Sequence, residues 1–390
     1  MKHTLLYMLF AAALPGWAQR PALLDSIEAN NTSLQALVVQ TQATMQQNRS
    51  DMRLSDPEAE VGYFFGSPKG IPNRVNVSVS QSLDWGVITG RRRKLAKAGD
   101  IVAHENYRLQ RQTVLAEALQ TLTQMVYYNR LCNELDERLQ LAQEMQLLYE
   151  KKFAEGDLNQ LEVNKVKLNA TVAQAELRRA QSERQALQLN LQRLNGGKPL
   201  ECNDTLYYAE ALPALADLMA QVKESHPQVL SSEGAIKQSL QQLKLAKSES
   251  WPTFSVGYSG EYVKDSKYSG ITLGMSIPLW GNTRAKVRQS RTEVLARQLD
   301  LADVETQLSA SLQQQYATAL ALQQTADRLK DELKLTGNAR LLRRSLDEGQ
   351  ISLLDYLLEL SFYYDARTAQ LEAERDARLA AAALRSYLLG

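Results

Sequence analysis

The chain repeats itself at a nearly constant spacing, and this duplication constrains its fold more than any other feature of the sequence. Val61-Gly62-Tyr63 recurs as Val256-Gly257-Tyr258, displaced by 195 positions. Nearer the end of each copy, Glu155-Gly156 matches Glu348-Gly349 at a displacement of 193. Landmarks that keep one order over most of the chain indicate a structural unit of about 190 residues that is present twice.

A leader and a linker complete the predicted organisation. Residues 1–18 combine a Lys, a short apolar stretch and a small final residue, which is typical of a secretory signal peptide cut after Ala18. A buried helix or a membrane anchor is the alternative, but this apolar stretch is too short to span a bilayer as a helix. The predicted domains are the signal peptide 1–18, the first repeat 19–197, the linker 198–211 and the second repeat 212–390.

Each repeat contains a helical segment that is too long for a globular domain. Asp100–Glu155 contains neither Pro nor Gly, and Leu115, Leu119, Leu122 and Val126 have coiled-coil spacing. A helix of about 65 residues would span on the order of 100 Å, so we predict a rod. The predicted helical elements are first helices at 22–52 and 212–249, long helices at 90–154 and 283–346, tip turns at 155–158 and 347–351, and return helices at 158–194 and 351–388.

Between the first and the long helix, each repeat has two segments in which apolar and polar residues alternate. Val75, Val77 and Val79 alternate with Asn76 and Ser78, and the other segments follow the same rule. Such alternation over about ten residues is typical of membrane barrel strands, although hairpins resting on a helical body are the alternative. Four strands cannot close a barrel, so three chains supplying twelve are expected. The predicted strands are 60–66, 74–83, 253–263 and 269–279.

Aromatic and basic residues flank these segments. Trp85, Trp251 and Trp280 lie at strand ends, where an aromatic belt would meet the lipid headgroups. Basic runs follow at Arg91–Lys94 and Arg284–Arg291. We interpret them as charge at the membrane interface, because aromatic residues interleaved as in a nucleic-acid site are absent from both runs. The formal net charge of the whole chain, +1, gives no separate indication of a nucleic-acid partner.

The duplicated unit, with Pro before its first strand and Trp-Gly after its second, resembles the TolC-like outer-membrane efflux proteins. The resemblance implies a mainly α fold with a small transmembrane β part, built from a duplicated helix–β-hairpin–long helix–helix unit. It implies a homotrimer in the outer membrane with a twelve-stranded barrel and a twelve-helix periplasmic α-barrel. Its implied partners are a periplasmic adaptor (membrane fusion protein), an inner-membrane pump of the RND or ABC type, and outer-membrane lipid.

The resemblance also assigns roles to the two tip turns. They would form a gated periplasmic entrance, closed by a ring of carboxylates from Asp355, Glu359 and Glu162. Asp355 could instead be a first-turn carboxylate that the helix dipole favours. The residues expected to dock the adaptor are Phe153, Gly156, Asp157, Leu346, Gly349 and Gln350.

Other functions receive little support from the sequence. It contains no catalytic triad, phosphate loop or metal-ligand spacing, so we predict a protein without enzyme activity, cofactor or metal. Whether Cys132 and Cys202 form a disulfide is left open. A periplasmic adaptor or coiled-coil scaffold without a channel is the alternative function. The cargo cannot be read from these residues.

Overall fold

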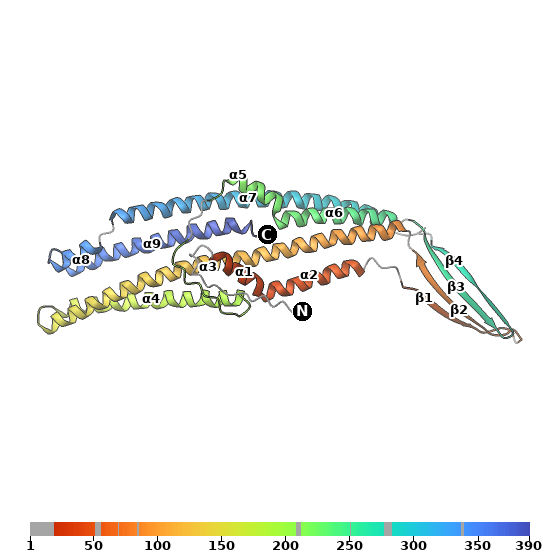
Figure 1. Cartoon of the computed structure of the whole chain (residues 1–390), viewed down its shortest axis with the longest axis horizontal. Helices are drawn as coiled ribbons and strands as arrows, with labels where there is room; N and C mark the ends of the chain where they lie inside the picture. Colours follow the sequence, from red (N-terminus) through yellow and green to blue (C-terminus); the bar gives the residue numbers. More distant parts are fainter. Residues whose placement is uncertain are drawn as a thin grey trace, which may run out of the picture. The chain divides into compact units, whose positions relative to one another are not determined.

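The computed structural model describes residues 19–50, 56–68, 70–83, 86–207, 212–249, 251–276, 283–336 and 339–390. The predicted signal peptide, Trp85 and Trp280 lie outside these ranges. Within them the chain forms helices and one four-stranded sheet (Figure 1).

Both repeats contain their elements in the same order. The first repeat comprises α1 (Gln19–Asn30), α2 (Thr32–Ser50), β1 (Glu58–Phe64), β2 (Arg74–Leu83), α3 (Gly86–Ala154) and α4 (Gln160–Leu194). The second comprises α5 (Leu215–Ser225), α6 (Pro227–Ser248), β3 (Thr253–Val263), β4 (Ser266–Ser276), α7 (Thr283–Thr336), α8 (Ala339–Asp347) and α9 (Leu353–Ser386).

The chain divides into two compact units, and each takes segments from both repeats. Unit 1 contains residues up to Gln35 together with Gln110–Val222 and Ser309–Gly390. Unit 2 contains Ala36–Leu109 and Lys223–Leu308, and therefore holds the whole sheet. Duplication in sequence thus does not produce two separately packed halves.

The helices predicted at 22–52 and 212–249 are each two helices, because a buried side chain starts a new helix within them. Asn31 precedes α2, and its Oδ1 accepts a hydrogen bond from the Leu34 amide at 2.9 Å. His226 precedes α6, and its Nδ1 accepts from the Gln228 amide at 3.3 Å. The two caps are 195 positions apart, so both repeats break at the same place.

The helix predicted at 283–346 is likewise described as α7 and α8, with residues 337 and 338 outside the described ranges. In contrast, α3 is a single helix of 69 residues, as the absence of Gly and Pro from Asp100 to Glu155 predicted for most of its length.

The sheet joins the two repeats through its central strands. Its order is β1-β2-β3-β4, and all neighbours are antiparallel. β2 pairs with β3 in a register that places Val79 opposite Tyr258. The four predicted strands form a single sheet. β1 begins and ends two residues earlier than predicted, and β4 begins three residues earlier, while the predicted strand residues 277–279 lie outside the described ranges. β1 and β4 are the two edges of the sheet.

Unit 1 is held together by apolar clusters along the helices. Leu115, Leu119, Leu122 and Val126 are all buried, which confirms the stripe predicted on the long helix. Leu122 packs in a cluster with Ile27 of α1 and with residues of the return helix α4. Burial of this stripe, rather than helix propensity alone, stabilises so long a helix in this unit.

The cap at His226 makes a testable difference between the repeats. Burial lowers the pKa of His226 below its usual 6.5, so the folded chain holds the ring neutral while the unfolded chain protonates near pH 6.5. The contribution of His226 to the stability of the folded chain is therefore complete above about pH 6.5 and decreases as the pH falls below that value. We expect His226→Asn, which copies the Asn31 cap, to remove this dependence in thermal unfolding at pH 8 and pH 5.5. Unchanged pH dependence in that variant, with the exposed His104→Asn as control, would contradict this account.

Candidate functional site

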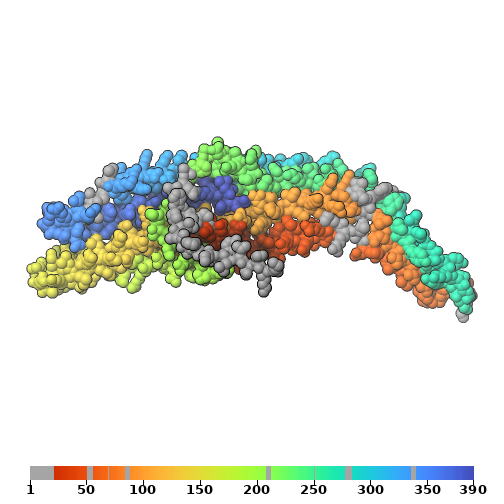
Figure 2. Space-filling view, viewed as in Figure 1, coloured from red at the N-terminus to blue at the C-terminus, as the bar shows by residue number. Residues whose placement is uncertain are grey.

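One face of the sheet is apolar and exposed. Rows of directly paired residues share this face, for example Val79, Tyr258 and Ile271, or Val256 and Leu273. Ile271 is 78% exposed and Leu273 is 80% exposed, which is unusual for large apolar side chains. Figure 2 shows the strands, in orange and teal, as a thin layer with no helix over the face in view. An exposed apolar surface of this kind is typical of a site that contacts a membrane or another protein.

The opposite face of the sheet is polar. Ser259 Oγ donates to Asn76 Oδ1 at 3.1 Å, and Arg74 forms an ion pair with Glu261 at 3.0 Å. Its other positions are mainly Ser, Thr and Gly, together with Glu58 and Glu60 on β1. The sheet thus has one apolar face and one polar face, which is the pattern of strands that lie between lipid and an aqueous lumen.

Of the predicted interface anchors, the described residues include Trp251. It lies two residues before β3 and is 51% exposed. An exposed indole at this end of the sheet fits the headgroup level of a membrane.

The two tip turns have the same backbone conformation, 193 positions apart. In the first, the Gly156 amide donates to Phe153 O and the Asp157 amide to Lys152 O, both at 3.0 Å. In the second, the Gly349 amide donates to Leu346 O at 3.0 Å and the Gln350 amide to Ser345 O at 2.8 Å. Both glycines have positive φ, +87° and +71°, which ends the incoming helix.

The predicted docking residues all lie in or beside these turns. Leu346 is partly buried against the cluster that contains Tyr356, whereas Phe153, Gly156, Asp157, Gly349 and Gln350 are exposed. The turns therefore present a polar surface with a single exposed aromatic side chain, Phe153.

The predicted gate carboxylates begin the return helices. Asp355 is the third residue of α9, and its Oδ2 accepts from Ser352 Oγ at 2.6 Å, while its amide donates to Ser352 Oγ at 3.2 Å. Glu162 completes a capping box with Asn159 at the start of α4. Glu359 lies one turn after Asp355 and is exposed. Asp355 and Glu162 therefore have a local capping role, whatever further role they have.

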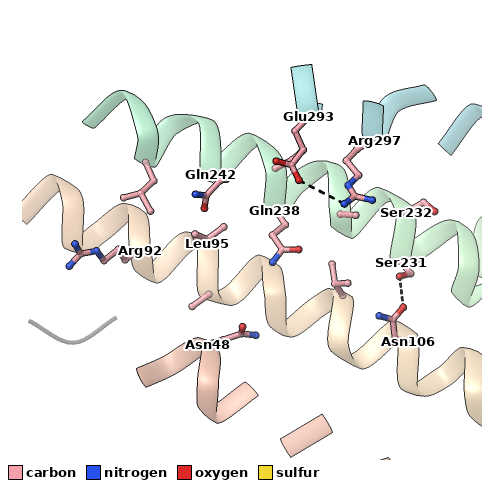
Figure 3. A pocket seen from close by; sticks show the side chains of 15 residues that line it. Asn48, Arg92, Leu95, Asn106, Ser231, Ser232, Gln238, Gln242, Glu293 and Arg297 are labelled. Atoms are coloured by element: carbon pink, nitrogen blue, oxygen red, sulfur yellow. Dashed lines mark hydrogen bonds and ion pairs between the residues drawn. The ribbon is translucent and has the colours of Figure 1, made fainter. Parts of the chain in front are cut away.

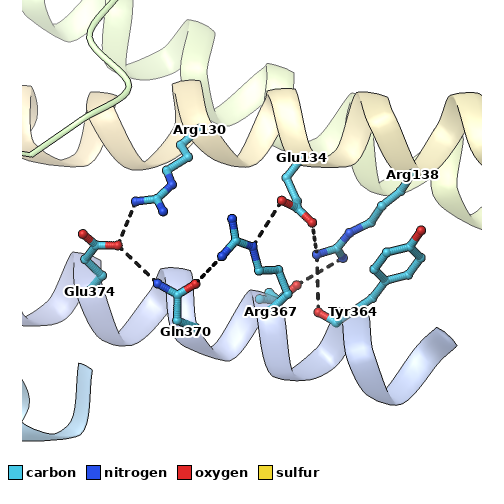
Figure 4. Close-up of polar contacts among 8 residues, drawn as sticks. Arg130, Glu134, Arg138, Tyr364, Arg367, Gln370 and Glu374 are labelled. Carbon is cyan, nitrogen blue, oxygen red and sulfur yellow. Dashed lines mark hydrogen bonds and ion pairs between the residues drawn. The ribbon is translucent and has the colours of Figure 1, made fainter. Parts of the chain in front are cut away.

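A polar network that the sequence did not reveal links α3 to α9 within unit 1 (Figure 4). Glu134 accepts hydrogen bonds from Arg138 and Arg367, both at 3.3 Å. Arg367 also donates to Gln370 Oε1 at 2.7 Å, and Arg130 pairs with Glu374 at 2.7 Å. The Arg138 guanidinium lies 4.3 Å from the centre of the Tyr364 ring, and burial raises the pKa of that tyrosine to about 12. The members lie up to 244 positions apart, so no local pattern could have indicated them.

Unit 2 contains a polar groove of about 720 Å³ between α2, α3, α6 and α7 (Figure 3). Ser231 Oγ donates to Asn106 Oδ1 at 2.7 Å across it, and Arg297 pairs with Glu293 at 3.8 Å on one wall. Asn48, Gln238 and Gln242 supply much of the remaining lining. This groove contains no nucleophile–base pair and thus does not indicate an active site.

Three further observations bear on the predictions. Both cysteines are buried free thiols, and burial raises the pKa of Cys132. Among the described residues, no group of three or more metal-ligating side chains is found. No helix in the described ranges has the length and apolar character that crossing a membrane would need.

Comparison with known proteins agrees with this geometry. Residues 218–389, nearly the whole second repeat, match the family described as Outer membrane efflux protein. A search of curated proteins found no match.

Similar solved structures extend the likeness to the whole chain. The outer membrane protein VceC from Vibrio cholerae is 15% identical, with a TM-score of 0.75 and 96% of each chain covered. The outer-membrane channel OprN is 16% identical, with a TM-score of 0.76 and coverage of 95% of this chain and 89% of OprN. The Campylobacter jejuni CmeC outer membrane channel is 18% identical, with a TM-score of 0.70 and coverage of 95% and 84%.

The class is therefore defined by fold: the chain has the TolC-like fold of outer-membrane channel proteins, mainly helical with a small sheet. The predicted resemblance to the outer-membrane efflux family is confirmed, in the second repeat by the family match and over the whole chain by the fold. The matching family and structures are described as efflux proteins and channels rather than as enzymes.

Proposed function

We propose that this protein is the outer-membrane channel of a tripartite efflux or secretion system, a passive trimeric conduit from the periplasm to the exterior. The observation that carries the proposal is the sheet, with its exposed apolar face, polar opposite face and two unpaired edges. A sheet in lipid must have no free edge, because each unpaired backbone N–H or C=O group there costs roughly several kcal/mol of free energy. Pairing β1 of one copy with β4 of the next, three times, gives a closed barrel of twelve strands.

Cross-linking between sheet edges tests the assembly. Within one chain, Ala59 and Ile271 lie in the same row but on opposite edges, about 14 Å apart at the usual strand spacing. Cysteines at these positions, joined by a short bis-maleimide, should yield a covalent trimer on a denaturing gel. Each single-cysteine variant should remain monomeric, with the native thiols buried in both.

The outcome also separates this function from a soluble adaptor or scaffold. A barrel trimer should migrate anomalously on an unheated gel and should fractionate with outer membranes. Recovery of the mature protein in the soluble periplasm, with no edge cross-link, would overturn the proposal.

We further propose that the tip turns form the periplasmic entrance and dock an adaptor, which connects the channel to an inner-membrane pump. The support is the matching backbone conformation of the two turns, which would give a trimer six turns of the same backbone shape. The exposed Phe153 gives the first turn an apolar anchor that Leu346, partly buried, does not give the second.

The gate within this proposal is testable because charge and capping can be separated. Asp355→Asn keeps a side-chain acceptor for Ser352 and removes the charge, and Glu359→Gln removes a second charge one turn later. If three symmetry-related carboxylates restrict the entrance, we expect either variant to raise single-channel conductance or weaken block by divalent cations. The double variant Asp355→Asn/Glu359→Gln is measured as well, and unaltered conductance and block in it would exclude a carboxylate gate at this position. Glu162→Gln tests the equivalent carboxylate of the first repeat.

A further inference from the structure

The helix ends next to the sheet carry a concentration of positive charge that the channel function does not use. Between Gly86 and Gly99, α3 contains five basic residues and no acidic one. The first ten residues of α7, 283–292, contain four basic residues and again no acidic one. The whole chain has a net charge of only +1, so this charge is localised rather than general.

Most of these side chains are exposed and lack an ionic partner among the residues that the structure describes. Arg93, Lys94 and Lys97 on α3 are exposed, as are Arg284, Arg288 and Arg291 on α7. None of these six, here called the basic collar, forms an ion pair with any carboxylate of the described residues. The nearby carboxylates are engaged elsewhere: Glu249 with Lys286 at 3.3 Å and Glu293 with Arg297 at 3.8 Å.

Other basic residues in the same region have clear structural roles, which sets the collar apart. Arg91 donates to Lys244 O and Ser248 Oγ and so joins α3 to α6. Arg284, Arg288 and Arg291 follow i, i+4, i+7 spacing, so they share one face of α7. Among the described residues, none of these three guanidinium groups takes part in a hydrogen bond or an ion pair.

The basic collar lies near the start of the two helices that follow the sheet in the chain: Arg93 is the eighth residue of α3 and Arg284 is the second residue of α7. Along a helix, Arg93–Lys97 and Arg284–Arg291 cover about 6 Å and 10 Å, comparable with one headgroup layer of a bilayer. The exposed indole of Trp251 lies at the same end of the sheet. From this juxtaposition we infer that the basic collar binds the phosphates of anionic phospholipid headgroups in the leaflet that faces the periplasm. The inference rests on the proposed membrane function.

The chemistry favours lipid over a free anion. Guanidinium groups bind phosphate oxygens in bidentate fashion, and Lys and Arg beside an apolar surface extend their charged ends toward headgroups. A soluble phosphate would gain only the ionic contact, whereas a phospholipid also buries its acyl chains against the apolar face of the sheet.

Quenching of tryptophan fluorescence by brominated lipid measures the binding. The trimer is reconstituted in phosphatidylethanolamine vesicles, and brominated phosphatidylglycerol or brominated phosphatidylethanolamine is then titrated in. We expect the wild type to prefer phosphatidylglycerol by about tenfold, with a preference that weakens at high salt. The variant Arg284→Gln/Arg288→Gln/Arg291→Gln should lose most of this preference, and free glycerophosphate should not compete.

A matched control removes the same charge elsewhere. Lys165→Gln/Arg178→Gln/Lys330→Gln changes three exposed cations of unit 1 and should keep the lipid preference. Equal preference in the wild type and the α7 variant, or competition by glycerophosphate, would overturn the inference while leaving the channel intact. Failure of the wild type to insert into vesicles would instead overturn the proposed function, and the inference with it.

Discussion

Leu273→Arg should remove the protein from the outer membrane without unfolding the helices. Leu273 lies on the apolar face of β4 and is 80% exposed in the single chain, so its replacement disturbs no intrachain packing. In a lipid-facing strand, an arginine near the bilayer centre costs roughly 2–4 kcal/mol, and a trimer contains three copies. We expect the variant to accumulate in the periplasm or be degraded, as membrane fractionation would measure.

The neighbouring position supplies the control. Thr272 is exposed on the polar face of the same strand, so Thr272→Arg introduces the same side chain toward the aqueous side. It should insert and assemble normally and change only the conductance. Equal loss of both variants from the membrane would show that β4 tolerates no charge on either face, and the lipid-facing assignment would be wrong.

Glu134→Ala should strongly destabilise unit 1. Its carboxylate accepts from Arg138 and Arg367, and the Arg138 side chain is 9% exposed, so removal leaves two cations facing each other with little water. Removing one partner of a buried ion pair costs about 3–5 kcal/mol, and the partial exposure of Glu134 places the expected loss near the lower figure.

Hydrogen exchange localises that loss better than a melting curve, since a chain with two units need not unfold in one step. Amides of α3 and α9 around the network should exchange faster in the variant, while those of the sheet should not change. Glu137→Ala, one turn along and exposed, should alter stability by less than about 0.5 kcal/mol. Similar protection in the two variants would mean that apolar packing alone holds α3 to α9.

The elements predicted most accurately are those with a local period. Alternation at Val75, Val77 and Val79 specifies a strand, and the absence of breakers after Asp100 specifies a long helix, whatever the rest of the chain does. The break at Asn31 could not be predicted in this way, since Asn, Thr and Ser residues stand next to one another there and none of them interrupts the helical pattern by itself. His226 followed by Pro227 was a stronger signal, because Pro favours the first position of a helix.

The residues of the candidate site likewise divide into those that a local sequence pattern indicates and those that only the folded chain brings together. Ser352 followed three residues later by Asp355 is a recognisable start of a helix, so the capping role of Asp355 was available in the sequence. The polar network around Arg130 and Arg138 could not be read from the sequence, because the partners of these residues on α9 lie more than 220 positions away. The same limit applies to the basic collar. Both runs were visible in the sequence, but their lack of carboxylate partners depends on the folded chain.

The change in repeat spacing from 195 to 193 has a consequence for how far the two copies remain interchangeable. Seventy residues separate Gly86 from Gly156, but sixty-eight separate Gly281 from Gly349. Omitting two residues from an α-helix rotates everything beyond by about 200° and shortens it by about 3 Å. A helical segment moved from one arm to the other, beyond the point where the lengths diverge, would therefore present a different side to its neighbours. The two copies keep the same order of elements, but their long arms are no longer interchangeable.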